Sequence, residues 1–573
     1  MNALNDFINE VILGAMGIYG GACRKRYLRL SKHAGADSER RLLSYLRRNR
    51  NTEFGRKYGF GRITSAEEYS RAVPFTSYPD YADMLERTAM KNEQRLITAD
   101  RISFFAKTSG TTGVTKRIPV VDRSYKPYLR CASIYIKILR QEMKRRGIKR
   151  GRGLNTIETE YSYTPGGIKE GFISAYALSS VKTVTPFINC LPKEVFGYGD
   201  DINMKYVKAR FALADRGLVY MMSVFMSTLT DLMHYIEENR ELLISDIAGG
   251  SITAPGIPEE LRQKLLKHIR PDKARAEEIR AVLDSPEAGP VIPRLWKNMC
   301  LIVAIGTGEF EPFSKKMREY CGGDIRFCYE MYAASEALFA SALNAEDENY
   351  LLIPDGGFFE FIPVDEEFDE EHSRPLLMNE LKVGELYEIV LTSLAGLYRY
   401  RIKDVVRVVG YEGEVPLIRF GYRKDQLINV TGVKLTSEHL STAIRSFEER
   451  VGVRILDYSL YPDTSYTPWR ITAFMEPEND IPEELRGSLS AIFDEELSKV
   501  NAEHGRMLKV GESSPSEVLI VRPDTYRRLR AENAKRKLSG NQVKTVRFID
   551  TKEKLDYFMD AVADRLPQGR EHA

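Results

Sequence analysis

The sequence predicts an α/β fold made of a large N-terminal domain and a small C-terminal α+β domain. The chain has 573 residues, which is more than one ordinary hydrophobic core accommodates. From Ile102 onward, short apolar segments of strand type alternate with longer segments of helical type, as in α/β proteins. A charged stretch at residues 421–425 precedes a last segment of ordinary domain size. We therefore expect an N-terminal domain over residues 1–421 and a C-terminal domain over residues 422–573.

The first hundred residues are expected to be helical. Residues 39–48 place Leu42, Leu43 and Leu46 on one stripe among basic residues. Residues 11–22 are apolar but too short to span a bilayer, and the charges around them run opposite to those of a signal peptide. We expect a docked amphipathic helix there and no stable membrane insertion, with weak peripheral attachment as the alternative.

The later elements follow from hydrophobic periodicity and from residues that break it. Helices are expected at residues 125–145, 227–243, 259–283 (with a break at Pro271), 437–450 and 483–500. Strands or extended segments are expected at residues 102–106, 118–120, 218–222, 301–305, 357–362, 386–391, 405–409, 427–430 and 471–475.

Composition excludes several classes of protein. The 84 basic and 81 acidic residues leave a net charge of +3, which gives no electrostatic case for binding nucleic acid. The six cysteines are scattered without a CxxC pair, so we expect neither a disulfide framework nor a zinc site. That cysteine usage favours a reducing compartment, and we expect a cytoplasmic protein that is a monomer.

The most informative segment is the loop at residues 107–117, which reads Lys-Thr-Ser-Gly-Thr-Thr-Gly-Val-Thr-Lys-Arg. It offers backbone N–H groups, hydroxyls and a cation to a polyphosphate. The residues proposed for this role are Thr108, Ser109, Gly110, Thr111, Thr112 and Lys116. The P-loop spacing GxxxxGK[ST] is absent, so a Walker-type NTPase is disfavoured. The alternative is a polar turn between two strands.

Three later segments are suited to the rest of a nucleotide. In residues 329–336, an aromatic ring is able to stack on adenine and Glu336 to hold Mg²⁺; the alternative is a helix start with core aromatics. In residues 396–404, Asp404 is suited to the ribose hydroxyls, while Arg399 and Arg401 are candidates for structural ion pairs. Residues 423–429 have the composition of a charged hinge.

In order and spacing, these segments resemble the adenylate-forming superfamily of firefly luciferase and the acyl-CoA synthetases. The resemblance is greatest to its acyl acid-amido synthetases, the auxin-responsive promoter or Gretchen Hagen three family. That family has a similar phosphate loop, a Tyr-Ala-Ser-Ser-Glu segment (here 332–336), and a Gly-Leu-Tyr-Arg-Tyr block ending in Asp (here 396–404). It also has a Gln-Tyr-Lys-Thr-Pro-Arg-like run, here 542–547. The departures are Ala334 for a Ser, Lys403 for a Gly, Val543 for a Tyr and Val546 for a Pro.

The resemblance implies a fold of mixed sheets and helices with a β-barrel element and a mobile C-terminal domain. It implies ATP and Mg²⁺, adenylation of a carboxylic acid, and transfer of the acyl group to an amino acid or other amine. The roles it implies are catalysis by Lys544 and Glu336, with Mg²⁺ on Glu336, and nucleotide binding by Tyr332, Ala333, Ser335, Asp404 and Arg423 beside the phosphate loop. An acyl-CoA ligase or stand-alone adenylating enzyme, and a non-catalytic binding protein of the same fold, stay open as alternatives.

Overall fold

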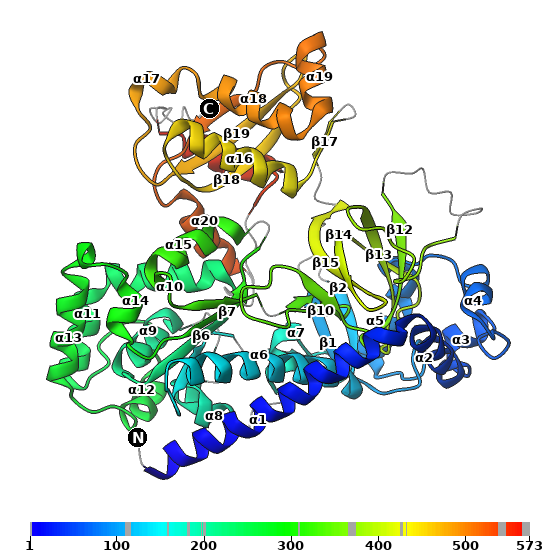
Figure 1. The fold of residues 1–573 in the computed structure, drawn as a ribbon, viewed down its shortest axis with the longest axis horizontal. Helices are drawn as coiled ribbons and strands as arrows, with labels where there is room; N and C mark the ends of the chain where they lie inside the picture. Colours follow the sequence, from blue (N-terminus) through cyan, green and yellow to red (C-terminus); the bar gives the residue numbers. More distant parts are fainter. Residues whose placement is uncertain are drawn as a thin grey trace. The chain divides into compact units, whose positions relative to one another are not determined.

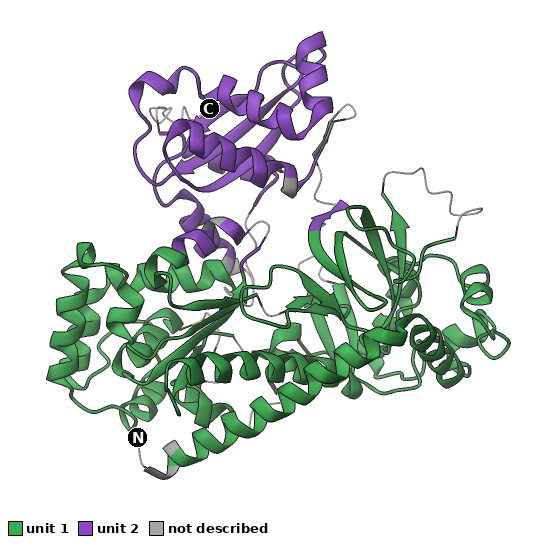
Figure 2. Ribbon diagram, viewed as in Figure 1, with its two compact units in different colours: residues 1–305, 317–420 green, residues 306–316, 421–573 purple. Residues whose placement is uncertain are grey.

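The structure is a computed structural model. It describes residues 3–108, 116–157, 160–179, 184–195, 198, 202–307, 310–329, 331–364, 374–424, 428–430, 433–536, 546–549 and 551–563. The chain forms two compact units (Figure 2): residues 1–305 with 317–420, and residues 306–316 with 421–573.

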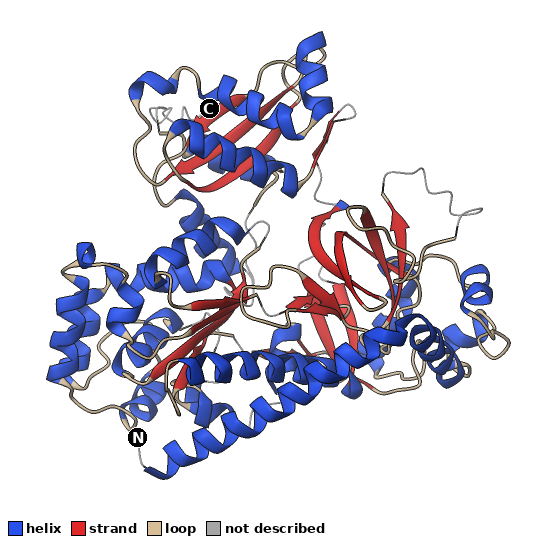
Figure 3. Cartoon of the chain, viewed as in Figure 1, coloured by secondary structure: helices blue, strands red, loops and turns tan. Residues whose placement is uncertain are grey.

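The first unit contains most of the helices (Figures 1 and 3). They are α1 (Ala3–Leu30), α2 (Ala34–Asn49), α3 (Glu53–Lys57), α4 (Ala66–Ala72), α5 (Ala82–Lys91), α6 (Tyr125–Arg145), α7 (Ile173–Ser179), α8 (Thr185–Ile188), α9 (Met204–Ala214), α10 (Met226–Glu238), α11 (Arg240–Gly249), α12 (Glu259–Leu266), α13 (Lys273–Leu283) and α14 (Val291–Leu295). The long α1 packs along α6. The next helix, α15 (Glu311–Cys321), is divided, because its residues up to Lys316 belong to the second unit.

Three sheets form the framework of the first unit (Figure 3). A parallel sheet has the order β3 (Arg152–Asn155), β6 (Leu218–Phe225), β7 (Leu301–Ile305) and β8 (Arg326–Cys328). A second sheet has the order β2 (Lys116–Val121), β1 (Ile102–Thr108), β5 (Lys169–Gly171) and β4 (Tyr161–Tyr163). The third has the order β12 (Phe358–Pro363), β13 (Leu386–Thr392), β14 (Tyr400–Glu412), β15 (Val415–Arg423), β11 (Tyr350–Leu352), β10 (Leu338–Ser341) and β9 (Met331–Ala333).

The second unit has its own hydrophobic core. A sheet of β18 (Ile455–Asp463), β19 (Arg470–Pro477) and β20 (Glu517–Ile520) packs with α16 (Ser437–Val451) and α18 (Leu489–Val500). The remaining elements are the hairpin β16 (Ile428–Val430) and β17 (Val433–Leu435), with α17 (Glu483–Arg486), α19 (Ala502–Val510), α20 (Thr525–Arg536) and α21 (Lys552–Asp560).

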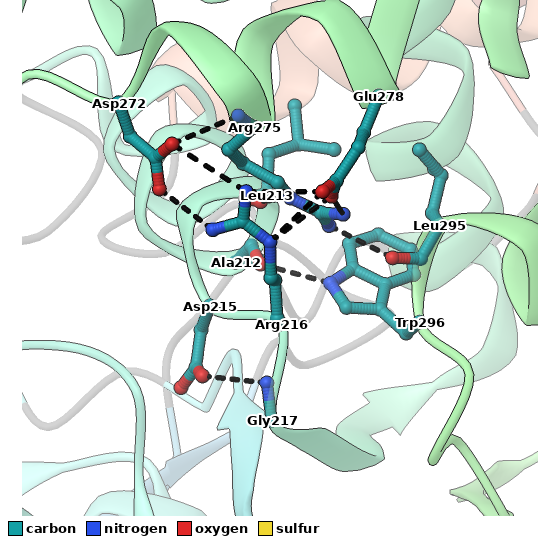
Figure 4. A network of polar contacts seen from close by, with 10 residues as sticks. All are labelled: Ala212, Leu213, Asp215, Arg216, Gly217, Asp272, Arg275, Glu278, Leu295 and Trp296. Carbon is teal, nitrogen blue, oxygen red and sulfur yellow. Dashed lines mark hydrogen bonds and ion pairs between the residues drawn. The ribbon is translucent and has the colours of Figure 1, made fainter. Parts of the chain in front are cut away.

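A network of polar contacts fixes the helices beside β6 (Figure 4). The guanidinium of Arg216 pairs with Asp272 at 2.6 Å and with Glu278 at 3.0 Å. Arg275, on α13, donates to the carbonyl oxygens of Leu213 and Leu295 at 2.7 and 2.8 Å. Because these carbonyls lie outside the regular hydrogen bonding of α9 and α14, the buried arginine satisfies groups that would otherwise be costly to bury.

Most predicted elements are confirmed, and three of the predicted helices are each divided in two. The helix expected at 483–500 is α17 and α18, which are separated at Gly487 and Ser488. The helix expected at 125–145 is α6, and the break expected at Pro271 separates α12 from α13. The helix expected at 227–243 ends at Glu238, where the Asn239 side chain donates to the carbonyl oxygen of Tyr235 at 3.0 Å. Asn competes in this way with helical hydrogen bonding. The mixed α/β class with a large first and a smaller second part is also confirmed.

Candidate functional site

The predicted phosphate loop joins two paired strands. β1 and β2 are antiparallel, and Thr108 at the end of β1 lies opposite Lys116 at the start of β2. Ser109, Gly110, Thr111 and Thr112 lie outside the described residues, so their phosphate-binding role stays a prediction. A seven-residue connection between hairpin stems is long enough to present several backbone N–H groups at one point.

Glu170 on β5 holds both stems of this hairpin. Its carboxylate pairs with the Nζ of Lys107 at 2.9 Å and with the Nε of Arg117 at 3.0 Å. Burial raises the pKa of Glu170, but hydrogen bonds from Lys107 and Arg117 outweigh burial and hold that pKa below its usual value. The carboxylate therefore stays ionised and ties β1 and β2, the strands on either side of the predicted loop, to β5.

Tyr78 supports the other side of the hairpin. Its hydroxyl accepts a hydrogen bond from the backbone N–H of Arg117 at 3.1 Å. The Nζ of Lys116 lies 5.8 Å from the centroid of the Tyr78 ring, within the range of a cation–π contact. Lys116 is thus held at the base of the predicted loop.

Two of the predicted nucleotide residues are brought together by different strands of the seven-stranded sheet. The hydroxyl of Tyr332, on β9, donates to Oδ2 of Asp404, on β14, at 2.7 Å. Asp404 is buried, and the Tyr332 ring stacks on Phe339 with centroids 5.1 Å apart. The hydrogen bond orients the carboxylate, and the stacked ring fixes the position of the hydroxyl that makes it.

The backbone before Asp404 adopts a conformation that favours glycine. Lys403 has φ = 65° and Arg399 has φ = 47°. The predicted departure at Lys403, where the resembled family has Gly, therefore falls on a left-handed residue. The guanidiniums of Arg399 and Arg401 pair with Glu360 at 3.2 Å and Glu388 at 2.7 Å, which confirms the prediction of structural ion pairs.

Ser335 and Glu336 lie at the turn between β9 and β10. The backbone N–H of Ala334 donates to the carbonyl oxygen of Ala337 at 2.9 Å, which closes a tight turn with Ser335 and Glu336 at its corners. Both corner residues line a pocket of about 230 Å³. Pro119 and Val120, which follow Lys116 on β2, line the same pocket. The predicted metal ligand and the strand leaving the predicted phosphate loop thus meet at one cavity.

The floor of this pocket includes buried polar groups. Tyr128, on α6, is buried, and its hydroxyl has no hydrogen-bond partner among the described residues. Burial, together with the charge of Glu336, raises the pKa of Tyr128, so its hydroxyl is a neutral donor at physiological pH. Asp355 is held by Arg130 at 2.6 Å and Arg26 at 2.9 Å.

Arg423 and Lys544 belong to the second unit. Arg423 is half-buried at the end of β15, whereas Lys544 lies outside the described residues. The chain is described again at residues 546–549, where Phe548 bridges to Leu460 of β18. Arg547 pairs with the buried carboxylate of Asp457 and donates to the carbonyl oxygen of Tyr458 at 2.7 Å. These contacts fix the chain three residues after Lys544.

Sequence reasoning missed the residues that support the site. Glu170 and Asp355 carry no motif, and each acts on a group far away in the sequence. Only the fold brings such pairs together.

The fold has a close relative among solved structures. The acyl acid amido synthetase GH3.15 superimposes with a TM-score of 0.84 at 23% identity, covering 94% of this chain and 96% of that one. The fold is therefore that of the acyl acid amido synthetases, with the phosphate-loop hairpin and the Tyr332–Asp404 pair built on its sheets.

The domains and the relatives agree with this class. The N-terminal, central and C-terminal domains of the GH3 family match residues 23–325, 350–423 and 438–553. The chain belongs to the GH3 family. A jasmonoyl–L-amino acid synthetase of Oryza sativa subsp. japonica is 26% identical, covering 91% of this chain and 93% of that protein. A probable indole-3-acetic acid-amido synthetase of Arabidopsis thaliana is 25% identical, covering 91% and 90%. The predicted family and the predicted class, an amide-forming ligase, are confirmed.

Among the described helices, none combines the length and the apolar character that crossing a membrane requires.

Proposed function

We propose that this chain uses ATP and Mg²⁺ to convert a carboxylic acid to its acyl-adenylate and then transfers the acyl group to an amino acid or another amine. In the first step, a carboxylate oxygen attacks the α-phosphorus and pyrophosphate leaves. In the second, the amine nitrogen attacks the acyl carbon and AMP leaves. We propose the cytoplasm as the compartment and a monomer as the working form.

The observation that carries this proposal is the pocket at the β9–β10 turn. Glu336 and Ser335 line it beside the strand that leaves the predicted phosphate loop, and Tyr332 of the same hairpin holds Asp404. Such an arrangement suits an acid whose carboxylate lies next to the α-phosphate of ATP. The work of the protein at this step is positioning and charge neutralisation.

We assign roles to the residues around this pocket. The Glu336 carboxylate is the kind of oxygen ligand that Mg²⁺ prefers, and the metal neutralises charge on the phosphates. The Ser335 hydroxyl, in the same pocket, binds the α-phosphate. Asp404, oriented by Tyr332, accepts hydrogen bonds from the ribose hydroxyls, with the Tyr332 and Ala333 segment beside the adenine. The loop from Thr108 to Lys116 holds the departing phosphates.

We assign the second domain, residues 422–573, the role of a mobile cap that pivots near Arg423. Lys544 then reaches the α-phosphate or the bridging oxygen during adenylation. Closure of such a cap excludes water from an adenylate that hydrolyses readily.

The test is product identification. The protein is incubated with ATP, Mg²⁺ and a panel of carboxylic acids, with either mixed amino acids or CoA as acceptor, and the products are identified by mass spectrometry. We expect an acyl amide together with AMP. Acyl-CoA as the sole product would identify a CoA ligase, and no AMP with any acid would identify a binding protein that keeps the fold.

A further inference from the structure

The pocket beside Glu336 is rich in positive charge. Its lining residues include four cations, Arg41, Arg123, Lys126 and Arg130, against two carboxylates, Glu336 and Asp355. The cations come from two separate parts of the first unit, since Arg41 lies on α2 and the other three lie at or just before the start of α6. A pocket for a purely apolar acid has no need of such a lining.

Among the described residues, acidic partners neutralise one of these cations. Arg130 is bound to Asp355 at 2.6 Å, and Asp355 also pairs with Arg26 at 2.9 Å. Arg41, Arg123 and Lys126 have no acidic partner among the described residues. Since Glu336 is assigned to Mg²⁺, the pocket keeps an excess of positive charge after all assigned roles are filled.

Of these cations, Arg41 would be stabilised most by an anionic ligand. It is half-buried and lines the pocket beside Tyr45. Its Nε is buried and has no hydrogen-bond partner among the described residues, and neither has the hydroxyl of Tyr128 in the same pocket. A guanidinium that is partly removed from water without a counter-ion is costly. An anionic oxygen bound there would recover that cost, and the planar fork of arginine suits a carboxylate or a phosphate.

The size of the pocket limits what enters it. Its volume of about 230 Å³ lies below the ~300–1,000 Å³ typical of sites for drug-sized ligands. A small acid therefore fits within this lining. Its reacting carboxylate has to lie on the side of Glu336 and β2, so a group bound by Arg41 belongs to the remainder of the acid.

We infer that the acid activated by this chain is a small acid with a second anionic group, which Arg41 binds together with Arg123 and Lys126. This inference rests on the proposed function, because it takes the pocket beside Glu336 as the site of the acid. It names the substrate class of this chain: a dicarboxylate or an acid of equivalent charge, recognised by a guanidinium.

The test compares acids in pairs that differ only in the second charge. Acid-dependent exchange of labelled pyrophosphate into ATP is measured with succinate and butanoate, adipate and hexanoate, and isophthalate and benzoate. We expect kcat/KM to be at least tenfold higher for the dicarboxylate in one or more pairs. The variant Arg41→Gln should lose at least tenfold in kcat/KM for that acid through a higher KM, and Arg41→Lys should recover part of the loss.

The matched control is Arg40→Gln. Arg40 precedes Arg41 on α2, is largely exposed and pairs with Asp37 at 3.0 Å, so this change should leave all exchange rates unaltered. If Arg41→Gln fails to fold, the double variant Arg123→Gln/Lys126→Gln serves instead. Both of the replaced side chains are exposed. This variant should also reduce the ratio of kcat/KM for the dicarboxylate to kcat/KM for the matched monocarboxylate.

The outcomes separate the inference from the proposed function. Exchange with monocarboxylates and no dicarboxylate preferred in any pair would overturn the inference and leave the proposed function intact. A raised KM for ATP in Arg41→Gln, with the acid preference unchanged, would assign these cations to the nucleotide phosphates and also overturn it. No exchange with any acid would refute the proposed function itself.

Discussion

The carboxylate of Asp404 is oriented by the side chain of Tyr332. Tyr332 donates to it at 2.7 Å from a neighbouring hairpin, and the buried position of Asp404 keeps water from taking the place of that donor. A buried carboxylate held in this way is ready to accept hydrogen bonds from a ribose without first losing its own hydration.

The change Asp404→Asn should raise the KM for ATP in pyrophosphate exchange by about tenfold or more. Hydrogen bonds to charged groups contribute about 1.5–3 kcal/mol, and about 1.4 kcal/mol corresponds to a factor of ten. Tyr332→Phe removes the orienting hydrogen bond but keeps the carboxylate, so its effect should be smaller. An unchanged KM for ATP in folded Asp404→Asn would remove this residue from the nucleotide site.

Lys403 carries a conformational cost beside the site. At φ = 65° a non-glycine residue costs about 1–2 kcal/mol, part of which glycine recovers. Lys403→Gly should therefore leave the free energy of unfolding unchanged or raise it by up to ~1 kcal/mol, as measured by urea denaturation. Glu277→Gly, at an exposed position in the interior of α13, should lower it by about 1 kcal/mol. Equal losses from the two changes would contradict the strain at Lys403.

At the scale of elements, the β1–β2 hairpin depends on Glu170. The carboxylate is buried, and it pairs with one residue on each stem of the loop. Glu170→Gln keeps the shape but removes the carboxylate that Lys107 and Arg117 share, and Arg117 then keeps its ion pair with the more exposed Glu86. We expect a loss of about 2 kcal/mol in the free energy of unfolding, because hydrogen bonds to charged groups contribute about this much, and a higher KM for ATP.

The pH dependence of this contribution has a definite sign. The pKa of Glu170 in the folded protein lies below its unfolded value of about 4.3. The contribution is therefore complete above that unfolded pKa and is lost as the pH falls through the folded pKa. When denaturation is measured from pH 7 downward, the difference in the free energy of unfolding between the wild type and Glu170→Gln should become smaller in this acid range.

Glu86→Gln is the matched control for the hairpin. Glu86 pairs with the same Arg117 at 3.2 Å but is about half exposed, so its loss should change stability by less than about 1 kcal/mol. Equal effects of the two changes would show that burial of Glu170 does not matter for the hairpin.

Elements were predictable where one local signal decided them. The apolar periodicity of α6 and the proline between α12 and α13 are such signals. The division at Asn239 was not predicted, because an apolar pattern continues through it and a single Asn is a weak local signal for the end of a helix. The strands β18 and β20 were missed because their pairing with β19 is a property of the assembled sheet.

The same distinction applies to the site. Asp404, Glu336 and the phosphate loop were found because their residue types recur in a family with similar spacing. Glu170 was not found, because it lies 53 residues from Arg117 and nothing in the sequence joins the two. The cations of the pocket, on α2 and near the start of α6, were missed for the same reason.

At the scale of the whole molecule, the chain forms two compact units, and the matches to the family domains include residues of both. The first unit contains the predicted phosphate-loop hairpin, the Tyr332–Asp404 pair and the pocket. The second contains Arg423 and Lys544. Most of the described groups assigned to adenylation lie in the first unit, and adenylation is the part of the reaction that a single measurement addresses best.

That measurement is acid-dependent exchange of labelled pyrophosphate into ATP, with the wild type and Glu336→Ala compared at saturating Mg²⁺. We expect exchange in the wild type only when a suitable carboxylic acid is present, and its loss in Glu336→Ala. The control is Glu348→Ala, which removes a half-exposed carboxylate 3.5 Å from Arg419 and should exchange normally. Near-normal exchange in folded Glu336→Ala would contradict the metal assignment, and no exchange by the wild type with any acid would contradict adenylation itself.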